Sequence, residues 1–270
     1  MNRLIRFLLI CLVLPLVARA ADSTDDLYRT QAIVTGKGEK NRQLGFRDCL
    51  DRVILRVSGD QRLLASPKLA SLRDQAGDFV NSFTYQDRLA GVPIHDEQGS
   101  YDRPHDLTCN FDRARLDALL ADLGGGPWLE PRPTVVPLLV VERGEKRFIL
   151  AANGNEGPFM DISFAAASEL LAMRIAIPDK AGIAAANLDG QGLWKVDEAR
   201  LDLLAKDAGG DVPLLGRLVW SDQDLGWVAD WRIAFQGRTY DWQVRGVSFD
   251  EAFRVAMRGA AQVLSGNGQP

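Results

Sequence analysis

Apolar and polar residues follow one another along the first half of the chain in an order that predicts a small layered domain. Residues 27–35 show the two-residue period of a half-buried strand, and 41–57 repeat their apolar residues at helical spacing. Ser58 and Gly59 then supply a helix stop. Further elements are expected at 67–77 (helix), 79–88 and 102–111 (strands), and from the cap Asp112 to Leu123 (helix). The order β-α-α-β-β-α indicates an α+β layer domain.

Arginines interrupt the apolar residues of the helix expected over 41–57, and we place them on its solvated side. Arg47 with Asp51, and Asp48 with Arg52, are four residues apart and predict ion pairs along the helix surface. Each such pair contributes only a few tenths of a kcal/mol. The acids balance the arginines, so the pattern indicates an ordinary amphipathic helix.

The second half of the chain predicts another layered domain. Residues 134–150 read as a strand, a turn at Gly144 and a return strand. We expect helices at 163–173 and 197–207, a short strand within 174–179, and an antiparallel meander of three strands at 212–220, 227–235 and 239–245. Ser248 and Glu251 form a capping box that opens a last helix with a clear apolar stripe. That helix is expected to cover the meander.

A segment rich in glycine and proline, 124–133, separates the two halves and predicts a linker. The fold class expected is therefore α+β and α/β: two small layered domains, the second with a mixed sheet, a three-stranded antiparallel meander and a C-terminal helix packed on it. The expected regions are a signal peptide (1–20), an N-terminal α+β domain (21–123), the linker (124–133), a C-terminal α/β domain (134–266) and a disordered tail (267–270).

The N-terminus predicts export. Arg3 and Arg6 precede an apolar run over 7–17, and Ala18 and Ala20 stand where a signal peptidase requires small residues. The run is shorter than the roughly twenty residues of a membrane-spanning helix. We expect a cleavable signal peptide, a periplasmic location, and no membrane insertion after cleavage.

Net charge argues against nucleic acid as a partner. The leader holds three of the 32 basic residues and no acidic one, so about 29 basic residues face 36 acidic ones in the mature chain. A net charge of about −7 without a basic cluster does not suit the neutralisation of phosphates.

Two cysteines, Cys49 and Cys109, remain after removal of the leader. Each falls on the apolar face of its expected element, and an oxidising compartment permits a disulfide between them. The alternative is two small buried thiols that never meet.

Two groups of residues in the second domain are candidates for ligand binding. Trp220 and Trp227 flank a turn of the meander and could offer a platform to a glycan or peptide, although core packing produces the same alternation. Asp161, Asp179 and Asp189 lie in loops after expected strands, where open α/β sheets bind ligands. The alternative for these aspartates is a set of surface loops.

No motif of a catalytic or metal site occurs in the sequence. The two histidines, His95 and His105, stand in a polar segment without the spacing of metal ligands. There is no G-x-S-x-G or H-E-x-x-H sequence, and the glycine pair in TGKGEKN has neither the third glycine of a dinucleotide site nor the Lys-Ser/Thr of a P-loop. We expect no catalytic residue, no metal and no cofactor.

Several segments, among them "LRVSG" at 55–59 and "FD" followed by "LL" within 111–120, resemble the bacterial family catalogued as domain of unknown function 2066. The resemblance implies an exported protein of Gram-negative bacteria with no assigned activity. Together with the leader, it favours a non-enzymatic accessory or assembly protein of the cell envelope that acts through contacts with a protein partner. The alternative function is a small-ligand or glycan-binding module that uses the loops and tryptophans of the second domain.

Overall fold

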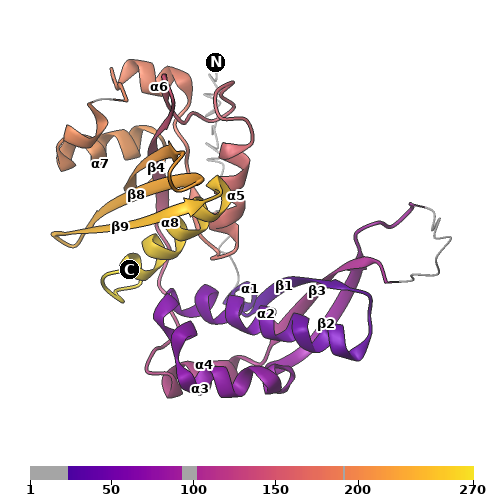
Figure 1. Cartoon of the computed structure of the whole chain (residues 1–270). Coiled ribbons are helices and arrows are strands. Elements are labelled where there is room, and N and C mark those ends of the chain that lie inside the picture. Colours follow the sequence, from indigo (N-terminus) through magenta and orange to yellow (C-terminus); the bar gives the residue numbers. More distant parts are fainter. Residues whose placement is uncertain (1–23, 93–101, 191) are drawn as a thin grey trace, which may run out of the picture.

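The computed structural model describes residues 24–92, 102–190 and 192–270, which form two lobes set at an angle to each other (Figure 1). The fold class is the expected one, with a three-stranded antiparallel sheet in the first lobe and a six-stranded mixed sheet in the second. The expected signal peptide and His95 lie outside the described residues. Within the part of the chain that is described, no helix combines the length and the apolar character that a membrane crossing requires.

The N-terminal lobe packs helices on one face of a sheet with the strand order β1-β3-β2. The long helix α2 buries one side against β1 and β3, and every second residue of β1 is buried beneath it. In chain order the elements are α1 (Thr24–Leu27), β1 (Arg29–Thr35), α2 (Glu39–Ser58), the 3₁₀ helix η1 (Gln61–Ala65), α3 (Pro67–Leu72), the 3₁₀ helix η2 (Arg73–Phe79), β2 (Val80–Asp87), β3 (Pro104–Phe111) and α4 (Arg113–Asp122).

The C-terminal lobe is built on the sheet order β5-β4-β7-β8-β9, with β6 also paired to β4. Strand β4 runs parallel to β7 and β6, whereas β7, β8 and β9 form the predicted antiparallel meander. The elements are β4 (Thr134–Arg143), β5 (Lys146–Ile149), α5 (Met160–Glu169), β6 (Arg174–Ile175), α6 (Lys180–Ala185), the 3₁₀ helix η3 (Leu193–Lys195), α7 (Glu198–Asp207), β7 (Val212–Ser221), β8 (Gly226–Phe235), β9 (Arg238–Val247) and α8 (Phe249–Leu264).

Helices cover the two faces of this second sheet unequally. On one face α5 and α8 enclose a large core in which the rings of Phe164 and Phe253 stack at 4.5 Å and contact Trp231. Gly259 on α8 makes room for the ring of Trp242, because a Cβ atom there would lie 2.4 Å from the indole Cε2. On the other face α7 and η3 cover a smaller apolar cluster around Val136, Leu138 and Leu215. The remainder of that face is left open.

The C-terminal end of α2 joins the two lobes. The last four carbonyls of a helix have no partner within it, and here each accepts a hydrogen bond. Leu55 O accepts from the main chain of Gly59, which caps the helix at φ 70°, and Arg56 O accepts from Arg132 Nη2 at 2.6 Å. The remaining two acceptors are Val57 O, bonded to Trp128 N at 2.8 Å, and Ser58 O, bonded to Asn267 Nδ2 at 3.2 Å.

Three of these donors come from segments that the sequence predicted to be a linker and a disordered tail: Trp128 and Arg132 from the linker, and Asn267 from the tail. The linker residue Trp128 is buried in the core of the second lobe, with Arg132 over its ring. In the tail, Asn267 contacts α2 and Gln269 donates to Asp241 O on β9 at 2.6 Å. The polar side chains of Asn267 and Gln269 thus satisfy carbonyls of a helix end and of a sheet edge.

Other differences from the sequence-based expectations are local. The segment expected as one helix over 67–77 is α3 followed by η2, and α5 begins at Met160 instead of Ser163. Helix α6 was not predicted, because it buries none of its residues and so shows no apolar period. The ion pair expected between Arg47 and Asp51 is replaced, because Arg47 pairs with Asp74 at 2.6 Å and Asp51 pairs with Arg73 at 3.0 Å. Arg52, expected to pair with Asp48, donates to Gln31 O instead.

Candidate functional site

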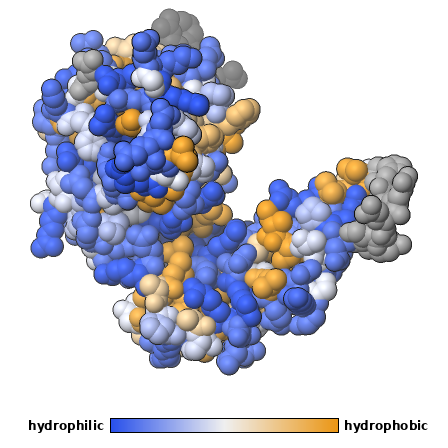
Figure 2. All heavy atoms as spheres, in the orientation of Figure 1, coloured by the Kyte–Doolittle hydropathy of each residue, from blue (hydrophilic) through white to orange (hydrophobic). Residues whose placement is uncertain are grey.

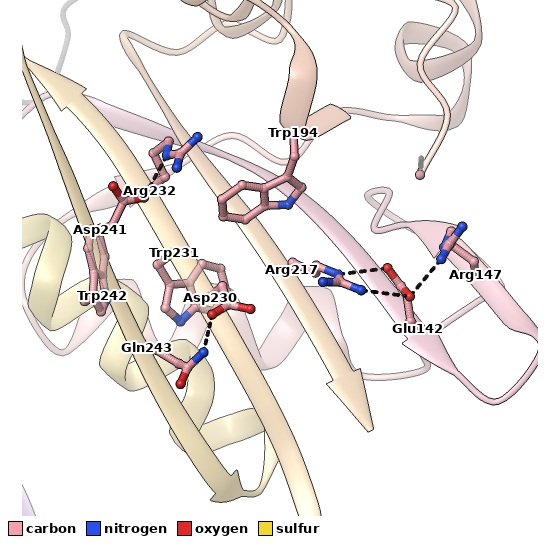
Figure 3. A pocket seen from close by; sticks show the side chains of 11 residues that line it. Glu142, Arg147, Trp194, Arg217, Asp230, Trp231, Arg232, Asp241, Trp242 and Gln243 are labelled. Atoms are coloured by element: carbon pink, nitrogen blue, oxygen red, sulfur yellow. Dashed lines mark hydrogen bonds and ion pairs between the residues drawn. The ribbon is translucent and has the colours of Figure 1, made fainter. Parts of the chain in front are cut away.

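The open half of the second sheet forms a hollow of ≈ 870 Å³ on the face that α8 does not cover (Figure 3). Strands β4, β7, β8 and β9 form its floor, and the segment between α6 and α7 forms one rim. The lining residues are Glu142, Arg147, Gly190, Trp194, Arg217, Asp230, Trp231, Arg232, Asp241, Trp242 and Gln243.

The two-residue period of the strands places the charged residues together. On β8, Ala229, Trp231 and Ile233 face the core, so Asp230 and Arg232 point to the opposite face. The register sets Asp230 opposite Arg217 of β7, and also opposite Gln243 of β9, whose Nε2 donates to it at 2.5 Å. Polar side chains of three neighbouring strands thus meet in one row, and those of Arg217 and Asp230 are charged.

Glu142 lies at the centre of an ion-pair triad. Its side chain is only 14% exposed, and its carboxylate accepts from Arg217 Nε at 3.0 Å and from Arg147 Nη2 at 2.9 Å (Figure 3). Burial opposes ionisation, but the hydrogen bonds and positive charges of the two arginines outweigh it. The pKa of the Glu142 carboxyl is therefore held below its usual range.

Trp194 covers the other side of the hollow. Its ring lies 5.0 Å from the Arg232 guanidinium, which also pairs with Asp241 at 2.7 Å. The indole Nε1 of Trp194 is buried and has no hydrogen-bond partner among the described residues. A buried N–H donor without a partner is uncommon and marks a place where a ligand or water could accept.

The described lining holds three arginines and three carboxylates, so its formal charges cancel. A general acid or base that works at neutral pH needs a carboxyl pKa raised toward 7, whereas the pKa of Glu142 is lowered. Across the described residues there is also no group of three side chains able to hold a metal. The arrangement presents fixed donors and acceptors, which suits binding of a polar, uncharged group.

Replacing Glu142 by glutamine is expected to lower the free energy of unfolding of the C-terminal lobe by about 1–2 kcal/mol, because two arginines lose their shared partner. The lowered pKa makes this contribution complete above about pH 4.3, the ordinary value for glutamate, and it is lost as the pH falls through the folded-state value. Urea unfolding of wild type and Glu142→Gln at neutral and acidic pH measures it. The difference should shrink in acid; Glu145→Gln in the exposed β4–β5 turn is the matched control.

The structure brings Trp220 and Trp227 together but makes them a packed pair. They are cross-strand partners with ring centroids 5.5 Å apart, and Trp227 is buried. Arg143 lies 4.9 Å from the Trp220 ring, and the indole Nε1 of Trp220 donates to Asp222. This packing leaves little of the platform that the sequence offered as one alternative.

The three candidate aspartates serve the main chain of their own loops. Asp179 caps α6 by accepting from Gly182 N, and Asp189 accepts from Gly192 N. Asp161 accepts from Asn153 N at 3.2 Å and from Ile162 N. Asp179 lines a groove of ≈ 580 Å³ between α6 and α7 that neither Asp161 nor Asp189 lines, so the structure does not gather them at that groove.

Cys49 and Cys109 are both fully buried and lie at disulfide distance, with their Cα atoms 6.4 Å apart. The structure thus favours the bonded alternative over two separate thiols. His105, on the same strand as Cys109, is also buried, and its Nδ1 lies 2.7 Å from Arg103 O.

Sequence reasoning missed an apolar ridge, called the α5 ridge below, that is formed by α5 and the residues at its two ends. Phe159, Ile162 and Leu170 are 72%, 65% and 43% exposed, although all three are large apolar residues. They border a groove of ≈ 370 Å³ whose floor includes Ala166 and Phe249. The sequence signal that could have revealed the ridge is that α5 carries apolar residues on both faces, whereas the sheet can cover only one of them.

A protein-family model described as Domain of unknown function (DUF8605) matches residues 21–129, less than half of the chain. The match spans the N-terminal lobe, and it shows that the resemblance to domain of unknown function 2066 was wrong. A search of curated proteins and a search of solved structures found no match.

The segments that carried the mistaken resemblance are folding signals. "LRVSG" is the end of α2 with its left-handed Gly59, and "FD" places the cap Asp112, whose side chain accepts from Arg115 N, before Leu119 and Leu120 of α4. Helix stops and caps of this kind recur in unrelated proteins. They therefore identify elements and not families.

Proposed function

We propose that the protein is exported to the periplasm and acts there as a non-enzymatic accessory protein that binds an envelope protein through the α5 ridge. The leader in residues 1–20 supports export. The buried pair Cys49–Cys109 at disulfide distance suits an oxidising compartment.

The observation that carries the proposal is the exposure of the α5 ridge, Phe159, Ile162 and Leu170. Figure 2 shows apolar atoms along the side of the upper lobe that α5 forms. Contiguous exposed apolar side chains with a polar rim are typical of protein-binding surfaces. Ser163, Asp250 and Arg254 supply that rim, and Ser163 Oγ donates to Asp250 at 2.5 Å.

The backbone at Phe159 supports a functional role for this side chain. Phe159 precedes α5 in the left-handed conformation at φ 66°. A bulky residue is disfavoured there by about 1–2 kcal/mol relative to the right-handed region, whereas glycine is not. A strained, exposed phenylalanine is the kind of outlier that clusters at functional sites.

Phe159→Gly should therefore raise the free energy of unfolding by up to about 1 kcal/mol and abolish partner binding. Binding is measured in the native host by a photo-crosslinking residue at Ile162, which should capture one recurrent envelope protein in wild type and lose it in Phe159→Gly. Thermal unfolding measures the stability.

Leu225→Gly is the matched control. Leu225 is 84% exposed in the β7–β8 turn at φ 50°, so its replacement should relieve similar strain without touching the ridge. Capture that survives Phe159→Gly, or that is equally strong from a crosslinker at Leu225, would count against the proposal.

A second candidate function is binding of a small polar ligand or glycan in the hollow of Figure 3. It is favoured by the unpartnered Nε1 of Trp194 beside three arginines and three carboxylates of the described lining. It ranks second because the carboxylates of the hollow already accept hydrogen bonds from Arg147, Arg217, Arg232 and Gln243.

A further inference from the structure

Strand β1 lies at the edge of its sheet, so half of its main-chain N–H and C=O groups point away from the neighbouring strand β3. Among the described residues, β1 pairs only with β3, in the order β1-β3-β2. Phe111 N donates to Tyr28 O and Gly36 N donates to Arg103 O, so the even-numbered residues exchange main-chain hydrogen bonds with β3. In an antiparallel pair the intervening residues direct their N–H and C=O groups to the other side. Arg29, Gln31 and Ile33 thus present main-chain groups at the free edge.

This free edge borders a groove between the two lobes. The groove measures ≈ 530 Å³ and is lined by the consecutive residues 29–33 on one side and by Ala166, Glu169 and Leu170 of the α5 segment on the other. Successive strand residues point to opposite faces, so a lining of consecutive residues indicates that the main chain itself meets the groove. Figure 1 shows β1 below the lower end of α5, at the angle between the lobes.

Positive charge predominates along the groove. Among its described lining residues are four arginines, at positions 29, 52, 56 and 88, against two carboxylates, Asp106 and Glu169. Arg29 pairs with Asp26 at 2.7 Å, and Arg88 pairs with Asp106 at 3.7 Å. Arg52 instead donates to the outward carbonyl Gln31 O at 2.8 Å and forms no ion pair with any described residue. Its guanidinium has five N–H donors, so it can also donate hydrogen bonds to a carboxylate.

We propose that β1 receives an extended acidic segment of the partner protein as a fourth strand, held between β1 and α5. Main-chain hydrogen bonds to the outward groups of β1 would supply affinity, as in other cases of strand addition. On the side of the new strand that faces α2 and α5, a carboxylate would meet Arg52, and an apolar residue two positions away would meet Leu170. This inference rests on the proposed function and states which kind of partner segment binds.

Strand β9, a long edge strand of the second lobe, is less suited to receiving an added strand. On β9 the pairing with β8 is interrupted by a register shift between Trp227 and Ala229. Irregularities of this kind obstruct strand addition. The edge of β1 also has a second wall, α5, that belongs to the proposed ridge.

The test uses the mature full-length protein and a phage-displayed library of random peptides somewhat longer than the seven residues of β1. We expect selection to enrich peptides with an acidic and an apolar residue at positions i and i+2. A synthetic copy of the most enriched peptide should lose its binding when alternate main-chain nitrogens are methylated, because methylation removes the strand hydrogen bonds and keeps the charges.

Two variants locate the binding. Ile33→Pro removes one outward N–H group from an edge strand, a place where proline is tolerated. Arg52→Gln removes the charge that forms no ion pair with the described residues. Each variant should weaken peptide binding about tenfold, as measured by fluorescence anisotropy. Arg238→Gln, on the exposed start of β9, is the matched charge control and should bind as wild type. Circular dichroism of Ile33→Pro verifies that the lobe remains folded.

Absence of enrichment, equal binding of the methylated peptide, or wild-type affinity in both Ile33→Pro and Arg52→Gln would each overturn strand addition. Those results would leave the crosslinking from Ile162 unaffected, so the partner could still bind the α5 ridge alone. Loss of that crosslinking with intact peptide binding would instead overturn the proposed function and retain the peptide site.

Discussion

In the double variant Cys49→Ala/Cys109→Ala, the free energy of unfolding of the N-terminal lobe should be about 4 kcal/mol lower than in the oxidised wild type. The two cysteines are 60 residues apart, and a bond between them lowers the conformational entropy of the unfolded chain. Both side chains are fully buried between α2 and β3, so their removal also leaves a small void. A domain stabilised by the usual 5–15 kcal/mol would lose a large share of its stability.

Hydrogen exchange measured by mass spectrometry can follow the two lobes separately in rising denaturant. Peptides from α2 and β3 should lose protection first in the double variant, and peptides from β8 and α8 should behave as in wild type. A reducing agent should reproduce the effect in wild type and add nothing in the double variant. Equal loss in both lobes would contradict the expectation and show that the lobes unfold as one unit.

Phe253→Ala should destabilise the C-terminal lobe by about 3–5 kcal/mol, the usual cost of removing a buried ring. Phe253 is fully buried on α8, stacks on Phe164 at 4.5 Å and contacts Trp231. Its ring joins α5 and α8 to the sheet, so the cavity cannot close without moving a helix.

Tryptophan fluorescence during urea unfolding measures this effect, because all six tryptophans lie at or after position 128. The midpoint for Phe253→Ala should fall while exchange of α2 stays unchanged. Leu203→Ala on α7, where the side chain is 60% exposed, provides the matched control and should change stability by less than about 0.5 kcal/mol. A fluorescence midpoint that matches wild type would mean that Phe253 is not part of the core.

The correct predictions from the sequence rested on residues that specify the local structure of their own segment. The alternation along β8, the caps Asp112 and Ser248 and the glycine stop at Gly59 each specify an element from its own sequence. The same local character explains the mistaken family resemblance, since caps and stops are shared by many folds. It also explains why α6 was missed, because a short helix without buried residues carries no apolar period.

The ion pairs of α2 show where local reasoning ends. Arg47 and Asp51 are correctly spaced to meet each other, yet each pairs with a residue of η2. Exposed pairs along a helix are weak, so partners brought close by tertiary packing replace them readily.

By itself, the sequence determined the two-lobed α and β architecture, the core faces of its strands and long helices, and the chemistry available at each position. Only the tertiary structure decided which faces stay uncovered. The hollow depends on β4 lying beside β7, the ridge on α5 having a sheet on one side alone, and the groove on β1 facing a helix of the other lobe. Period and propensity act over a few neighbouring residues, whereas these sites arise from contacts between segments far apart in the chain.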